Sequence, residues 1–210
     1  MQSILEKARQ NPESIKAKIL SAARRIFGEY GFHGTTMRMI ARDVGIDISS
    51  LHYHWGEKKD LYEAVIIDIN NDLGKKLTEV ERSIRGKPLE ERIAIGIDVM
   101  TDYLFNNPEI SNLVLYRYFT KTRYEASQDL KVPEFTRDIV HSMGLGEDAE
   151  HLPQSMASVL AIMNSIHNFI AGENVFGPVI KLEKENYRQL VKKTLKSIFI
   201  AAFVRDTANP

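Results

Sequence analysis

The sequence predicts an all-α protein, and three observations support this fold class. Apolar residues recur every three or four positions through most of the chain, which is the spacing of a helix that buries one face. Asn, Thr, Asp or Pro begins many of these periodic segments, and Gly or Pro follows several of them. No segment shows the sustained alternation of apolar and polar residues that is typical of strands.

The N-terminal helices follow from capping signals and apolar spacing. The first lies between Asn11-Pro12 and Gly31, because Asn before Pro suits a helix start and Gly suits its end. Thr36 caps a short helix that Gly45 stops, and Asp47 caps the next one through its carboxylate. A long striped helix follows over residues 58–85. It contains Gly74, which is read either as a hinge or as a tolerated glycine.

Five more helices are predicted in the remaining chain. The stretches RGKP and NNP interrupt the helical pattern, because Gly and Pro both disfavour a helix interior. The total is about nine helices. The predicted ranges are 89–104, 108–123, 133–143, 153–172 and 183–205.

Composition limits the possible classes of protein. The 210 residues allow one large or two small domains, and the formal net charge is zero. Residues 1–60 carry ten Lys or Arg against seven Asp or Glu, a local excess of three positive charges. Cysteine is absent, which excludes disulfides and thiolate chemistry. No apolar run approaches the roughly 20 residues of a membrane span, and MQSILEKARQ lacks a signal-like stretch. We therefore expect a soluble, cytoplasmic protein.

Two short predicted helices, over residues 37–44 and 48–54, form a pair. The turn between them is Gly45-Ile46-Asp47. Two short helices joined by a three- or four-residue turn that contains Gly are the arrangement of a DNA-binding helix-turn-helix. Apolar residues can pack the pair against each other and against the first helix. The residues left facing away from the core are Arg38, Ile48, Ser49, Ser50 and Tyr53.

The stretch ILSAARRIFGEYGFHGTTMRMIARDVGIDISSLHYHWGEKKDL resembles the N-terminal DNA-binding domain of the tetracycline-repressor (TetR) family. The family pattern runs through Thr-x-x-x-Ile-Ala, Gly-Val-Ser, Leu-Tyr-x-His-Phe and Lys-x-x-Leu. Here it reads Thr36, Ile40-Ala41, Gly45-Ile46-Asp47, Leu51-His52-Tyr53-His54-Trp55 and Lys58-Lys59-Asp60-Leu61, without a gap. The resemblance covers residues 13–62. It implies a DNA-binding domain over residues 1–62 and a ligand-binding and dimerisation domain over residues 63–210.

The resemblance also implies roles for single residues. Tyr53, His54 and Lys58 are expected at DNA phosphates, and Trp55 is expected to fill the small core. Position 52 departs from the family pattern, because His52 replaces the usual Tyr. An imidazole can still donate to a phosphate, more strongly when protonated. DNA binding is therefore expected to survive, and whether His52 itself contacts a phosphate is left undecided by the sequence. The remaining expected contacts, to base edges or nearby phosphates, are Thr36, Arg38, Ile48, Ser49 and Ser50.

The second domain is expected to hold a dimer interface and a ligand cavity. Its last two long helices carry apolar stripes wider than one neighbour needs to cover, which favours pairing in a homodimer. The stripe residues are Met156, Leu160, Tyr187, Val191, Leu195, Ile198 and Phe199. The candidate cavity residues, each of which can equally be ordinary core, are Met100, Tyr103, Tyr116, Phe119, Met163, Asn164 and His167.

The sequence favours a transcriptional regulator over an enzyme. No Gly-rich phosphate loop, zinc-protease motif or nucleophile elbow is present, and no cofactor is expected. His52 and His54 lie two positions apart and so point to different helix faces, which disfavours a metal site. We expect a repressor that binds a palindromic operator as a homodimer and is released by a small hydrophobic or aromatic effector. The alternative is a helical ligand-binding or interaction protein with little or no operator binding.

Overall fold

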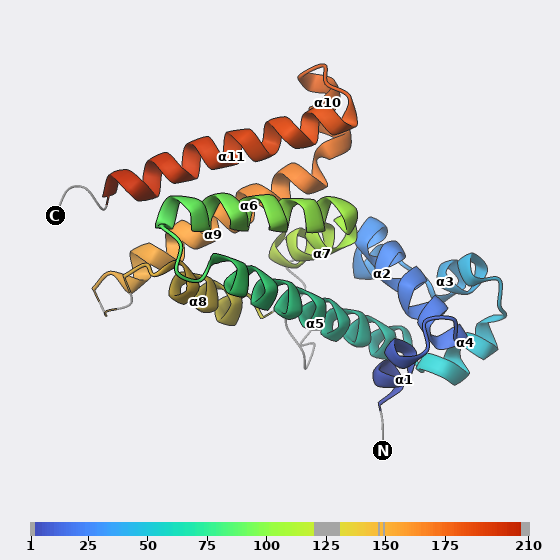
Figure 1. Cartoon of the computed structure of the whole chain (residues 1–210). Coiled ribbons are helices and arrows are strands. Elements are labelled where there is room, and N and C mark those ends of the chain that lie inside the picture. The colour runs from blue at the N-terminus through green and yellow to red at the C-terminus, as the bar shows by residue number, and fades with distance from the viewer. Residues whose placement is uncertain (1–2, 120–130, 147, 149, 207–210) are drawn as a thin grey trace. The chain divides into compact units, whose positions relative to one another are not determined.

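The computed structural model describes residues 3–119, 131–146, 148 and 150–206, except for the side chains of residues 119 and 204–206. The described residues form eleven helices and no strand, which confirms the all-α prediction (Figure 1). Among the described helices, none has the length and hydrophobicity that crossing a bilayer requires. In chain order the helices are α1 (Ile4–Gln10), α2 (Ile15–Gly34), α3 (Met37–Val44), α4 (Ile48–Trp55), α5 (Lys58–Ile84), α6 (Leu89–Asn106), α7 (Pro108–Phe119), α8 (Val132–Met143), α9 (Leu152–Ala171), α10 (Glu173–Val179) and α11 (Lys184–Asp206).

Two of these helices, α1 and α10, are additional to the nine that the sequence predicts. The α1 helix is short, and Ser3 and Glu6 form a capping box at its start. The α10 helix contains Gly177 and Pro178, residues that weaken a sequence-based prediction of helix. Both are too short to show a helical period clearly, and both are stabilised by packing against neighbouring helices.

The chain divides into two compact units. The N-terminal unit contains Met1–Asp72 and Asn112–Leu130, and the C-terminal unit contains Leu73–Ser111 and Lys131–Pro210. The helices α5 and α7 therefore each contribute residues to both units. The functional boundary predicted after residue 62 stays a prediction, because compactness does not test which segment binds DNA.

The core of the N-terminal unit is built by α2, α3, α4 and the first part of α5. The side chains of Phe27, Ile40 and Leu51 are fully buried there. Trp55 of α4 is buried as well, and its indole Nε1 donates to the Lys16 carbonyl oxygen at 3.2 Å. In Figure 1 the short helices α3 and α4 lie together against α2. Packing therefore fixes one face of α4 and leaves the opposite face exposed.

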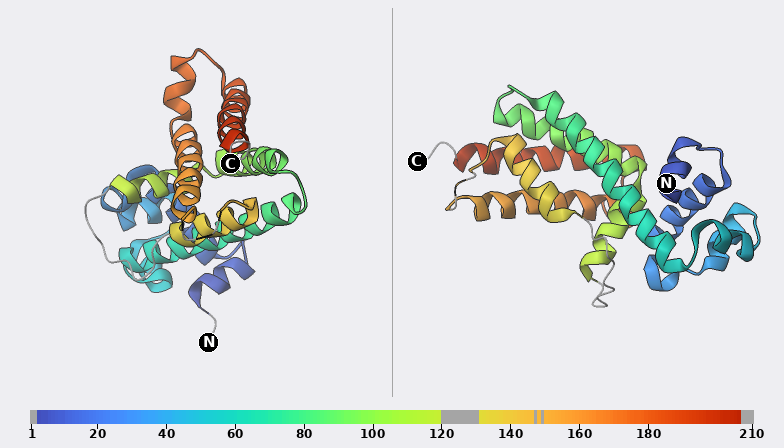
Figure 2. Two further views of the ribbon diagram at one scale, coloured as in Figure 1. Left: turned by 90° about the vertical axis from the view of Figure 1, so that its left-hand side faces the viewer. Right: turned by 90° about the horizontal axis from the view of Figure 1, so that it is seen from below.

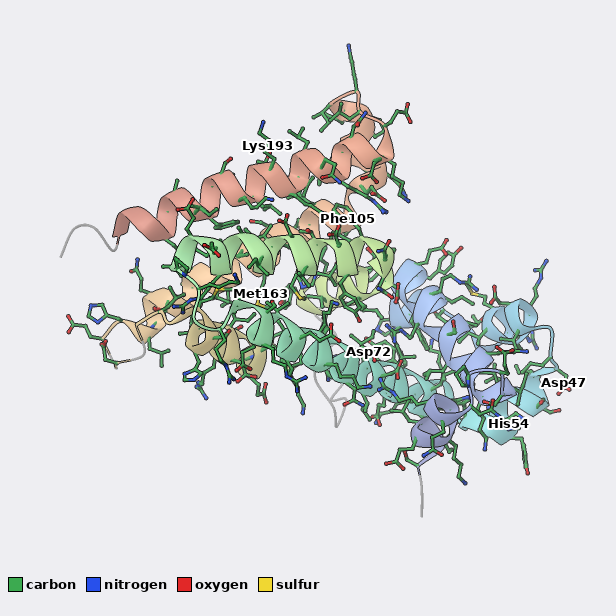
Figure 3. All side chains as sticks on the ribbon, in the orientation of Figure 1. Asp47, His54, Asp72, Phe105, Met163 and Lys193 are labelled. Carbon is green, nitrogen blue, oxygen red and sulfur yellow. The ribbon has the colours of Figure 1, made fainter. Side chains whose placement is uncertain are left out.

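Two arginines and two aspartates tie α1 and α2 to α5 within this unit. Arg9 of α1 contacts Asp68 at 2.6 Å and Asp72 at 2.9 Å. Arg24 of α2 contacts both carboxylates at 2.6 Å, and Asp72 is labelled in Figure 3. The Asp68 side chain is only 6% exposed. A buried carboxylate is tolerated only with such partners, because burial removes the water that would stabilise its charge.

The C-terminal unit is built mainly by α6, α8, α9 and α11. Its core includes Ile97 of α6, Val159 and Ile166 of α9, and Tyr187 of α11. The helices α6 and α11 run antiparallel in Figures 1 and 2. Their ion pairs agree with this direction, because Lys192 pairs with Asp102 and Lys196 pairs with Asp98, at 2.8 Å.

The α1–α2–α5 ion cluster generates the first prediction. Replacing Asp68 by Asn removes a buried charge and leaves two guanidinium groups short of a carboxylate, so we expect a loss of roughly 3 kcal/mol in the free energy of unfolding. Asp72→Asn is the matched control, with a smaller loss, because the Asp72 side chain is 30% exposed. Urea unfolding of both variants measures this difference. Equal losses below about 0.5 kcal/mol would show that the cluster does not stabilise the unit.

Candidate nucleic-acid interface and apolar cavity

The turn between α3 and α4 is defined by two caps and a glycine. Gly45 ends α3 with a left-handed backbone (φ 77°), a conformation that glycine adopts without strain. Thr36 begins α3 by accepting the Met39 amide, and Asp47 begins α4 by accepting the Ser50 amide. These contacts are local in sequence, which explains why the sequence predicts the boundaries of both helices to within a residue.

The outward face of α4 is exposed because its inward face is buried. Tyr53 is 85% exposed, whereas Leu51 and Trp55 are buried. Ile48 and Ser49 lie on the exposed face, and Arg38 of α3 is exposed as well. The structure thus presents one guanidinium, one phenol, one hydroxyl and one aliphatic side chain to solvent. Among the predicted contact residues, Ser50, His52, His54 and Lys58 are half-buried, and Thr36 is exposed.

The N-terminus of α4 carries a negative charge on this face. The Ser49 hydroxyl donates to Asp47 Oδ1 at 2.5 Å, and the Ser50 amide donates to the same atom at 2.7 Å. These two hydrogen bonds hold the pKa of the Asp47 carboxyl below its usual value. Since the Ser49 proton is engaged, the Ser49 oxygen is left as a hydrogen-bond acceptor for an incoming group.

The two histidines of α4 present different nitrogens. His52 Nδ1 lies 2.9 Å from the Gly56 carbonyl oxygen, which can only accept, so Nδ1 carries the proton. A neutral His52 therefore offers only an acceptor at Nε2 and donates to a phosphate there only when it is protonated. His54 Nδ1 is buried and has no partner among the described residues. The less costly tautomer leaves this nitrogen unprotonated, which places the N–H donor of His54 at Nε2.

Lys58 has a structural contact that the sequence reading did not anticipate. Its ammonium donates to the Thr35 carbonyl oxygen at 2.8 Å and lies 4.4 Å from the centre of the Phe32 ring. Lys58 thereby connects the start of α5 to the end of α2 within the N-terminal unit. A phosphate contact by Lys58 stays a prediction, and it would have to share the ammonium with these two partners.

The C-terminal unit contains a mainly apolar cavity of about 220 Å³ that is partly open. Of the seven predicted ligand-binding residues, Met100, Met163 and His167 line it, and Met163 is labelled in Figure 3. Gly74 also lies on its wall, where α5 continues as regular helix. Apolar neighbours that the prediction missed include Leu77, Ile97, Phe135, Ile139 and Phe203. These residues carry no signal of a cavity in sequence, because any buried apolar stripe looks the same.

The other predicted ligand-binding residues lie elsewhere. Tyr103 and Asn164 do not line the cavity, and the Asn164 amide donates to the Leu160 carbonyl oxygen of its own helix. Tyr116 belongs to the N-terminal unit, where its hydroxyl donates to the Glu29 carbonyl oxygen and its ring packs on Gly31. The side chain of Phe119 lies outside the described residues.

His167 is the polar group at the buried part of the cavity wall. It is 5% exposed, and its Nδ1 lies 3.0 Å from the Ser111 hydroxyl. Burial lowers the pKa of His167 to about 4, because the interior disfavours the charged imidazolium. His167 is therefore neutral at pH 7.

The predicted dimer residues divide into two sets. Tyr187, Val191, Leu195 and Phe199 are buried within the C-terminal unit, where α11 packs against α6 and α9. Met156 and Leu160 are half-buried, and Ile198 is 55% exposed. Further exposed apolar side chains lie on α10, at its C-terminal end and on α11, and they are Val175, Phe176, Val179, Ile180 and Leu190. Sequence periodicity finds the stripe of α11 but does not tell its inward residues from its outward ones.

Burial of His167 generates the second prediction, a loss of stability in acid. The unfolded chain binds a proton near pH 6.5, whereas folded His167 binds it only near pH 4. The free energy of unfolding should therefore fall between these values, by on the order of 3 kcal/mol. Urea unfolding at pH 7.5, 6 and 5 should show a flatter dependence for His167→Gln than for the unaltered protein. The control Gln154→Asn, at an exposed and uncharged position of α9, should keep the original dependence, and an unchanged profile in His167→Gln would contradict the assignment.

Comparisons with known proteins place the N-terminal unit in a family. The family model described as bacterial regulatory proteins, tetR family, matches residues 19–65. The HTH-type transcriptional regulator UidR of Escherichia coli K12 is 23% identical over 139 residues, which are 60% of this chain and 69% of UidR. The icaADBC negative transcriptional regulator IcaR of Staphylococcus aureus strain Newman is 45% identical over 49 residues, 23% of this chain and 26% of IcaR.

The fold is shared over most of the chain. The solved structure of a TetR-family transcriptional regulator from Streptomyces coelicolor superposes with a TM-score of 0.62 at 15% identity. The match covers 92% of this chain and 84% of that chain. With the helix-turn-helix geometry of α3 and α4, the family model identifies residues 19–65 as a domain of the tetR family of bacterial regulatory proteins, and the solved structure shows that most of the chain shares its fold.

Proposed function

We propose that this regulator binds a palindromic DNA operator as a homodimer, represses transcription by occupying it, and is released by a small, mainly apolar effector. The observation that carries the proposal is the outward face of α4, where Tyr53 is 85% exposed on a helix whose opposite face is buried. A helix held in this way can enter the major groove without disturbing its own packing.

The exposed side chains of α3 and α4 suit both kinds of DNA contact. Arg38 has the fork geometry that reads guanine, and Ile48 offers an apolar contact for a thymine methyl group. The Tyr53 hydroxyl and the Nε2–H of His54 are donors for phosphate oxygens, which fix the position of the helix. The negative charge of Asp47 disfavours nearby phosphates, so we expect the N-terminus of α4 to face bases and not the backbone.

A homodimer follows from the small reach of one recognition helix. One such helix reads only a few base pairs, and two related by a dyad are needed for a useful specific affinity. The exposed apolar residues of α10 and α11 support pairing through this face, because a monomer leaves Val179 and Ile198 in water. In this proposal the buried stripe of α11 stabilises the subunit, and the exposed residues form the interface.

Release by an effector requires that the effector bind the arrangement of the protein that cannot bind DNA more tightly than the arrangement that can. To shift the ratio of the two arrangements from 1:99 to 99:1, the effector's binding free energy for them must differ by about 5.5 kcal/mol. The cavity supports such a ligand site, because it is mainly apolar and contains thioether and aromatic side chains. The α5 helix supports the coupling, since one continuous helix supplies residues to the cavity wall and to the N-terminal unit.

Operator binding gives the third prediction. Arg38→Ala should lower specific affinity by roughly 10- to 100-fold and relax the base preference at one position of each half-site. Tyr53→Phe keeps the ring and removes the hydroxyl, so it should weaken binding to all sequences alike. Fluorescence anisotropy against DNA from around the protein's own gene, at several salt concentrations, measures both effects. The control is Lys75→Ala, an exposed position of the C-terminal unit. The docking surface is wrong if Arg38→Ala and Tyr53→Phe both bind DNA as the unaltered protein and the Lys75→Ala control do.

Dimerisation gives the fourth prediction. Ile198→Asp should yield folded monomers in sedimentation experiments and abolish operator binding, because it places a charge in the proposed interface. The matched control is Ile48→Asp, the same substitution at an exposed isoleucine of α4. This control should remain dimeric and lose operator affinity alone. A fully dimeric Ile198→Asp protein would place the interface elsewhere.

A further inference from the structure

The cavity in the C-terminal unit is mainly apolar but holds one buried polar group with a free nitrogen. His167 Nδ1 is taken by the Ser111 hydroxyl of α7, and the described residues give Nε2 no partner. His167 lines the cavity, and Nε2 is not among the fully buried atoms. The open nitrogen is therefore accessible from the cavity, where an unpaired polar atom is costly unless a ligand or water pairs with it.

The charges around the cavity have one sign. Glu81 and Asp138 line it, and no lysine or arginine is among the described lining residues. Asp138 and His141 are exposed, whereas Glu81 is half-buried and contacts Arg85 at 3.2 Å. An anionic ligand would meet these carboxylates and would find no lysine or arginine among the wall residues that the structure describes. An uncharged ligand avoids both the repulsion and the cost of burying a charge.

The volume sets the size of the ligand. An apolar protein cavity of roughly 150 Å³ holds benzene, and this cavity measures about 220 Å³. One ring with one or two small substituents fits this space, whereas a long acyl chain would extend beyond it. Phe135 and the thioethers of Met100 and Met163 lie on the wall and suit contact with a ring.

We propose that the cavity takes an uncharged, single-ring aromatic molecule that bears one hydroxyl or carbonyl oxygen, and that this oxygen pairs with His167 Nε2. The inference rests on the proposed function in that it names the chemical class of the effector. Neutral His167 gives either a donor or an acceptor at Nε2, depending on which partner of the Ser111 hydrogen bond carries the proton. A phenolic hydroxyl satisfies both cases. Ser111 is then a positioning residue, because it holds the ring of His167 in place.

The test compares three probes of similar shape by calorimetry at pH 7. These are p-cresol, p-xylene and p-toluate, which differ in carrying a hydroxyl, a methyl or a carboxylate. The unaltered protein should bind p-cresol about tenfold more tightly than p-xylene, the value of one hydrogen bond, and p-toluate most weakly. His167→Leu should remove the preference for p-cresol over p-xylene, and His167→Gln, which retains hydrogen-bonding groups, should restore part of it.

Several outcomes would overturn the inference: tightest binding of p-toluate, an unchanged preference in His167→Leu, or no binding of any probe. If His167→Leu does not fold, the three probes on the unaltered protein and on His167→Gln decide the matter. Operator release by p-cresol is measured separately. If p-cresol binds with the expected preference but does not release the operator, the ligand class stands and release by an effector is contradicted. If the probes release the operator without any preference among them, release by an effector stands and the ligand class is contradicted.

Discussion

The burial of Leu51 and Trp55 is the constraint on which the DNA-facing surface depends. These residues lie one helical turn apart on α4, and both are buried in the core of the N-terminal unit. The indole hydrogen bond to the Lys16 carbonyl oxygen fixes the end of the helix against α2. Tyr53 lies two positions from each and so points to the opposite side. The exposed face is thus a consequence of core packing, and a substitution that loosens Trp55 would act on DNA binding without touching DNA.

Buried polar groups differ in whether other residues of the protein pair with them, and this difference separates structural from candidate binding positions. Asp68 is buried and fully engaged by two arginines, and the result is a rigid connection among α1, α2 and α5. His54 and His167 each keep a ring nitrogen without a protein partner among the described residues. One lies on the candidate DNA-binding helix and the other on the wall of the cavity. An unpaired nitrogen on a cavity wall is costly unless a ligand or water pairs with it, which supports a binding role for His167, whereas the buried Nδ1 of His54 leaves Nε2 as the nitrogen that can meet DNA.

Sequence predicts the features that local chemistry decides. The caps at Thr36 and Asp47 and the glycine at position 45 set the limits of α3 and α4, so these limits are readable without a structure. Contacts between distant residues are not readable in this way. The pairing of Arg9 with Asp68, the Lys58 contact with Thr35, and the position of Tyr116 away from the cavity all depend on how the helices pack. Periodicity marks the apolar stripe of α11, but only packing shows that Leu195 faces inward and Ile198 outward.

In the proposed function, the outward face of α4 is the surface that meets DNA. Methyl NMR of the isoleucine-labelled protein, titrated with a duplex from around its own gene, tests this most directly. The Ile48 methyl signal should move most and saturate with the DNA, whereas the Ile198 signal, on the proposed dimer face, should stay in place. An unmoved Ile48 signal, with saturating shifts confined to isoleucines of the C-terminal unit, would contradict the claim.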